Sequence, residues 1–109
     1  MMRVFLEREG FSVKGCVSGK EAVDLIDTEK FDLFIVDIML PYLNGLEVVD
    51  HIRNNSTKNA HAKVIIVSDI TNEDYVKDGF DIGADDIMRK PVSPPEFVAR
   101  VHHHLKKNT

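Results

Sequence analysis

The chain has 109 residues, of which 43% are hydrophobic and 29% charged, which is the balance of one globular domain and excludes a disordered chain. The net charge of −4 gives no broad positive field for nucleic acid or anionic lipid. The longest apolar runs, residues 33–36 and 64–67, fall far short of the ~20 residues of a membrane helix.

The single cysteine, Cys16, excludes an internal disulfide. The start of the sequence also lacks the apolar stretch of a signal peptide. We therefore expect a cytoplasmic protein that folds without a disulfide framework.

The first third of the chain predicts helix, strand, helix and strand in turn. Residues 1–9 have the pattern of the last turns of a helix, and residues 11–16 alternate loosely enough to predict only a weak strand. Ser18 and Glu21 match a capping box at the start of the next helix. Residues 31–37 form a nearly continuous apolar run, which is typical of a strand buried on both faces of a parallel sheet.

The same alternation continues to the end of the chain. Apolar residues at helical spacing mark a helix over 46–52, and a second buried strand follows at 63–68 after a polar loop. A helix over 75–83 and a short strand at 86–89 come next. Ser93, Pro94 and Glu96 predict a capped start for the last helix.

This order predicts an α/β fold, a doubly wound parallel sheet flanked by helices. In such folds the chemistry lies at the carboxyl ends of the strands. Asp37, Ser68 and Lys90 stand at three of those ends. A carboxylate can act as a nucleophile toward phosphorus, and a lysine and a hydroxyl can stabilise the charge of the phosphoryl group in transit.

Three blocks of residues together resemble the receiver domain of two-component response regulators. They are Asp37-x-x-x-Pro41-x-x-x-Gly45, the strand that ends at Ser68, and Lys90-Pro91, and the resemblance covers residues 3–107. It implies a flavodoxin-like sheet of order 2-1-3-4-5 and one receiver domain over residues 1–109. It also implies a phosphoacceptor signalling domain, which is not an enzyme but assists its own phosphorylation and dephosphorylation.

The resemblance assigns a role to each matching residue. Asp37 is the expected phosphoacceptor, which takes a phosphoryl group from the phosphohistidine of a sensor kinase. Lys90 is expected to hold a phosphoryl oxygen, and the Ser68 hydroxyl to move toward the phosphoryl group on activation. Pro91 is expected to follow a cis peptide bond that orients Lys90.

The resemblance also implies a metal site and a shaped loop beside Asp37. Asp37 and the backbone carbonyl of Met39 are the expected ligands of Mg²⁺, and Pro41 and Gly45 shape the loop. Ile87 stands where the family usually has an aromatic switch residue, which predicts an altered switch.

One further departure lies at the site itself. Asp69 follows Ser68 at a position where the family usually has Ala or Gly. A carboxylate there is expected to repel a phosphoryl group, and the alternative is that it helps to hold a cation.

The family normally begins with a strand followed by two acidic residues, whereas this sequence starts inside the first helix. We therefore expect four strands, an open apolar edge along residues 31–37 and a poor magnesium site. Three explanations compete. The start of the sequence is recorded too late, the chain is a fragment, or the protein is a degenerate receiver with a rearranged sheet. We favour truncation of an ordinary ancestor.

Several alternatives stay open. A degenerate pseudo-receiver would act as a phosphorylation-independent interaction or dimerisation module. A homodimer could form through the exposed sheet edge or through the face between Tyr75 and Lys107, which is also the expected output surface. A haloacid-dehalogenase-like phosphatase is disfavoured because it needs a second aspartate where Met39 stands. A flavin binder is disfavoured because no phosphate loop is present.

The expected partners are a sensor histidine kinase or phosphotransfer protein and an unknown output protein. No nucleic acid or membrane contact is expected. The run His102, His103 and His104 cannot converge on one metal ion, because successive helix residues point ~100° apart. Asp85 and Asp86 precede the last strand, and we expect them to cap loops rather than to bind metal.

Overall fold

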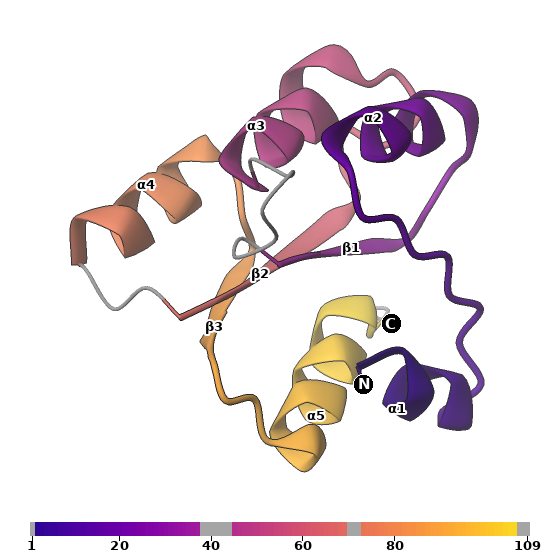
Figure 1. Cartoon of the computed structure of the whole chain (residues 1–109), viewed down its shortest axis with the longest axis vertical. Coiled ribbons are helices and arrows are strands. Elements are labelled where there is room, and N and C mark those ends of the chain that lie inside the picture. Colours follow the sequence, from indigo (N-terminus) through magenta and orange to yellow (C-terminus); the bar gives the residue numbers. More distant parts are fainter. Residues whose placement is uncertain (1, 38–44, 70–72, 107–109) are drawn as a thin grey trace.

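The computed structural model describes residues 2–37, 45–69 and 73–106. Within these ranges the chain forms a parallel sheet in the order β1-β2-β3, with helices on both faces (Figure 1). The elements in chain order are α1 (Met2–Arg8), α2 (Gly19–Thr28), β1 (Leu33–Asp37), α3 (Gly45–Asp50), η1 (His51–Asn55), β2 (Lys63–Ser68), α4 (Glu73–Ile82), β3 (Asp86–Arg89) and α5 (Pro94–Leu105). The predicted α/β class is confirmed.

The sheet separates two apolar cores, because successive strand residues point to opposite faces. On β2, Val64 and Ile66 pack with α2 and α3 on one face, while Ile65 and Val67 pack with α1 and α5 on the other. Figure 1 shows the same division, with α1 and α5 together on one side of the sheet. Burial on both faces explains why β2 is an unbroken apolar run in the sequence.

The expected strand at residues 11–16 is wrong, and the described sheet has three strands rather than four. A strand needs a neighbour to complete its ladder of hydrogen bonds, and this segment bonds elsewhere. The Phe11 N–H donates to the Leu6 carbonyl in α1, and Arg3 donates to the Val13 carbonyl. Phe11 and Val13 pack against the α1–α5 core, so their alternation reflects packing and not strand pairing.

The two predicted helix caps have different outcomes. Ser18 Oγ accepts the Glu21 N–H at 3.2 Å, as the capping box predicts. The Glu21 carboxylate accepts the N–H of Val17, at 3.5 Å, rather than that of Ser18. Ser93 occupies the cap position of α5 but its hydroxyl makes no capping bond. Pro95, at the second helical position, lacks the N–H group that is one of the two usual donors to a capping hydroxyl.

A buried asparagine ties the loop before β2 to its surroundings. The side chain of Asn59 is 1% exposed. Its Oδ1 accepts the Phe31 N–H, and its Nδ2 donates to the carbonyls of Ile26 and Glu29, each at 2.8 Å. One side chain thereby joins the end of α2, the approach to β1 and the approach to β2.

We expect Asn59→Ala to lower the free energy of unfolding by about 3 kcal/mol, because it leaves buried polar groups without partners. Chemical denaturation followed by circular dichroism measures the loss. Thr57→Ala, at an exposed position in the same loop, is the matched control and should change stability little. An equal effect of the two substitutions would contradict this role of Asn59.

Arg53 in η1 joins the connection before β3 to the body of the domain. Its Nε donates to the Gly83 carbonyl at 2.8 Å, and its Nη2 bonds Asp85 at 2.8 Å. Gly83 has a φ of +121°, and a Cβ there would lie 2.7 Å from Arg53 Cγ. Glycine is therefore required where α4 ends, both by its backbone angle and by the close approach of Arg53.

Candidate functional site

The carboxyl ends of the three strands bring together the residues that the sequence singles out. Asp37 is the last residue of β1 and Ser68 the last of β2, while Lys90 directly follows β3. The register places Asp37 opposite Val67 and Ser68 opposite Arg89. Because the strands are parallel, their carboxyl ends all lie on the same side of the sheet, which we call the carboxyl edge.

Asp37 and Lys90 form a direct ion pair across this edge. The Lys90 Nζ donates to Asp37 Oδ1 and to Oδ2, with both distances 2.8 Å. The side chains are 28% and 21% exposed for Lys90 and Asp37, so the pair is partly shielded yet open to solvent. A carboxylate thus lies in hydrogen-bond contact with an ammonium group, and such a pair has the chemistry to bind and stabilise a phosphoryl group.

Ser68 is buried at the same edge, with 1% of its surface exposed. The Lys90 N–H donates to the Ser68 carbonyl at 2.9 Å, which fixes the ends of β2 and β3 to each other. This hydrogen bond fixes the distance between the backbones of Ser68 and Lys90.

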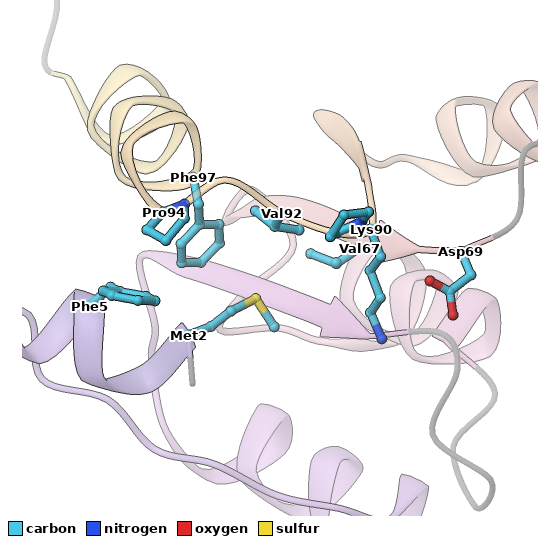
Figure 2. Close-up of a pocket in the computed structure, with 9 residues that line it drawn as sticks. Met2, Phe5, Val67, Asp69, Lys90, Val92, Pro94 and Phe97 are labelled. Atoms are coloured by element: carbon cyan, nitrogen blue, oxygen red, sulfur yellow. The ribbon is translucent and has the colours of Figure 1, made fainter.

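A cavity of about 490 Å³ opens beside Lys90 (Figure 2). Its polar end carries Lys90 and Asp69, and the rest is apolar. The sequence did not predict this cavity, because its walls come from α1, β2 and the start of α5. Only the fold brings these segments together.

Of the two expected magnesium ligands, only Asp37 lies among the described residues. Mg²⁺ requires a near-octahedral set of oxygen ligands. No group of three His, Cys, Asp or Glu side chains within residues 2–37, 45–69 and 73–106 could hold a metal ion. Both oxygens of the Asp37 carboxylate contact the Lys90 ammonium. Met39, the other expected ligand, lies outside the described residues, as does Pro41.

The remaining expected residues take structural positions around the edge. The Lys90–Pro91 peptide bond is cis. Gly45 is buried at the start of α3. Ile87 packs into the core beneath α4, where a Cβ added to Gly79 would lie 2.8 Å from its Cδ1. The short aliphatic side chain of Ile87 therefore fills the space between β3 and α4.

The histidine run on α5 contacts separate acids rather than one centre. His102 Nε2 lies 2.9 Å from Glu9, while His104 Nε2 lies 2.9 Å from Asp86. Arg100 also bonds both oxygens of Asp86. Asp86 therefore anchors α5 to the start of β3, the strand that leads to Lys90.

The pKa of Asp86 lies below the ordinary value of an aspartate. Burial acts to raise the pKa, but the hydrogen bonds from His104 and Arg100, together with the charge of Arg100, outweigh it. A lowered folded-state pKa means that the ionised carboxylate stabilises the fold above the unfolded-state pKa. This stabilisation is lost as the pH falls through the folded-state value.

Asp86→Asn should therefore cost about 1–2 kcal/mol of unfolding free energy near neutral pH. The difference from wild type should shrink as the pH falls from roughly 5 toward 3, because the wild-type carboxylate then takes up a proton. Denaturant titrations at a series of pH values measure it. A difference that stays constant over this range would show that the charge of Asp86 contributes nothing.

Comparison with known proteins identifies the family. The family described as response regulator receiver domain matches residues 1–102. The chain is 37% identical over 109 residues to the alkaline phosphatase synthesis transcriptional regulatory protein PhoP of Bacillus subtilis, covering 99% of this chain and 44% of that protein. It is 35% identical over 108 residues to the regulatory protein VanRc of Enterococcus gallinarum, covering 98% and 45%. The chain thus spans less than half the length of these relatives.

Solved structures show the same fold. A putative response regulator from Chloroflexus aurantiacus superposes with a TM-score of 0.88 at 27% identity, covering 98% of this chain and 87% of that one. No helix within the described ranges is long and apolar enough to cross a membrane. The flavodoxin-like parallel sheet, the motifs at its carboxyl edge and these matches agree, and the chain belongs to the response regulator receiver domains, a family of signalling domains.

Proposed function

We propose that this chain accepts a phosphoryl group on Asp37 from the phosphohistidine of a sensor histidine kinase or phosphotransfer protein. The observation that supports this most is the contact of the Lys90 ammonium with both oxygens of Asp37 at the carboxyl edge of the sheet. A carboxylate held in this way is oriented for attack, with a cation already in place for the transferred group.

In the proposed transfer, a carboxylate oxygen of Asp37 forms a bond to phosphorus as the bond from phosphorus to the imidazole nitrogen breaks. The nitrogen keeps the electron pair of that bond, and the product is an acyl phosphate. Lys90 would then pair with an oxygen of the phosphoryl group in place of the free carboxylate. The Ser68 hydroxyl would donate to another oxygen once it turns toward the group.

The partners and the location belong to the same proposal. We infer a cytoplasmic domain that changes the affinity of an output protein through the face between residues 75 and 107. We also propose assembly of a homodimer through the β1 edge, since β1 lies at the edge of the described sheet. Size-exclusion chromatography with light scattering distinguishes a dimer from a monomer.

The proposal is tested by incubating the purified chain with Mg²⁺ and acetyl phosphate and measuring its intact mass. We expect one phosphoryl adduct. Its complete absence, from a chain shown by circular dichroism to be folded, would contradict phosphoryl acceptance.

A second function is a phosphorylation-independent interaction module. Two observations favour it: the described residues lack a metal-binding acidic cluster, and Ile87 is packed against α4 in place of an aromatic switch residue. A partner that binds wild type and Asp37→Ala with equal affinity would support this function over the first.

A further inference from the structure

Asp69 lies beside Lys90 at the edge that carries the phosphoacceptor. Ser68 pairs with Arg89 in the register, and a backbone hydrogen bond of 2.9 Å joins Lys90 to Ser68. Asp69, which directly follows β2, is therefore held close to the end of β3. Figure 2 shows Asp69 and Lys90 at the same end of the cavity, with the Asp69 carboxylate on the side of the lysine.

The Asp69 carboxylate has no ion-pair partner in the described part of the chain. The Lys90 ammonium contacts both oxygens of Asp37, so this pair has no net charge. Asp69 is exposed and makes no hydrogen bond or ion pair with another residue in the described part of the chain. Asp37, Lys90 and Asp69 thus carry the charge of one carboxylate, and the exposed Arg89 at the end of β3 forms no ion pair with any of the three.

The surroundings strengthen the field of that charge. Apolar side chains screen a charge far less than water does. The apolar lining of the cavity consists of Met2, Phe5, Val67, Pro91, Val92, Pro94 and Phe97. An anion that approaches Asp37 past Lys90 therefore meets the Asp69 carboxylate with part of the intervening water excluded.

We propose that Asp69 is a specificity residue that selects phosphodonors by their charge. This inference rests on the proposed function of Asp37. Asp69 slows small donors that carry two negative charges. A phosphoryl group presented on the imidazole of a protein is disfavoured less, because the surface of that protein can supply compensating positive charge. The residue thereby suppresses phosphorylation by small metabolite-like anions in favour of a protein donor.

The experiment compares the rates at which wild type and Asp69→Asn form the adduct with acetyl phosphate, a dianion, and with phosphoramidate, which carries less negative charge at pH 7. Even with the screening of bulk water, removing one charge at a separation of roughly 8 Å should speed the reaction with the dianion at least about fivefold, and with a monoanion at least about twofold. Rates are followed by intact mass at several salt concentrations. The salt dependence with acetyl phosphate should be weaker in Asp69→Asn, because salt screens the repulsion.

Asp32→Asn is the matched control. Asp32 is exposed and directly precedes β1, so the substitution Asp32→Asn removes the same charge at the opposite end of the strands. It should leave the rate with either donor unchanged. Thermal unfolding of the three proteins verifies that each is folded.

The outcomes separate this inference from the proposed function. Equal rates and equal salt dependence in wild type and Asp69→Asn would overturn the charge selection while leaving Asp37 as the phosphoacceptor. A slower reaction in Asp69→Asn would also overturn it, and would indicate that Asp69 helps to hold a cation. The absence of an adduct in every variant would overturn both proposals.

Discussion

Asp37→Asn is expected to abolish the phosphoryl adduct that we expect wild type to form with acetyl phosphate. An amide oxygen is a far weaker nucleophile than a carboxylate oxygen and cannot give a stable acyl phosphate. Asparagine has nearly the same shape as aspartate, and the site is partly exposed, so the fold should persist. We therefore expect the change in intact mass to disappear while the circular dichroism spectrum is unchanged.

The control for Asp37→Asn is Asp32→Asn, a change of the same kind at the opposite end of the same strand. Asp32→Asn should form the adduct at the wild-type rate. An adduct that survives in Asp37→Asn would show that another residue accepts the phosphoryl group.

Lys90→Ala should slow formation of the adduct by about a hundredfold, which is typical for the loss of one charged group that stabilises a developing anion. The Asp37 carboxylate remains, but the ammonium that contacts both of its oxygens is lost. The initial rate with acetyl phosphate, measured by intact mass over time, gives the ratio of the two proteins.

Arg89→Ala is the matched control for Lys90→Ala, because Arg89 is the adjacent exposed cation at the end of β3. It removes the same charge beside the site without touching the contact to Asp37. A similar loss of rate in both variants would indicate a general effect of positive charge. It would count against a specific role for the Lys90 ammonium.

The strands that carry the site were predictable because burial leaves a strong pattern. β2 and β3 have the predicted bounds, 63–68 and 86–89, and the predicted strand at 31–37 includes β1. A strand covered on both faces must be apolar at nearly every position, and no solvent-facing helix has that pattern. The site follows from these strands, because parallel topology fixes which ends meet.

Other features depend on contacts that the sequence does not display. The segment at 11–16 has an alternating pattern but no strand partner in the described sheet. Asn59 and Arg53 were not predicted to matter, because their hydrogen bonds join segments separated by about 30 positions in the sequence. The cavity beside Lys90 was missed for the same reason, since α1 and α5 meet only in the folded chain.

The most direct test of the central claim is to locate the phosphoryl group on the wild-type chain. Borohydride reduces an acyl phosphate on aspartate to homoserine, so the modified position can be found by peptide mass spectrometry after treatment with acetyl phosphate. We predict homoserine at position 37 and at no other aspartate. Conversion of a different aspartate, or of none in a chain that has gained the phosphoryl mass, would contradict the assignment of Asp37 as the nucleophile beside Lys90.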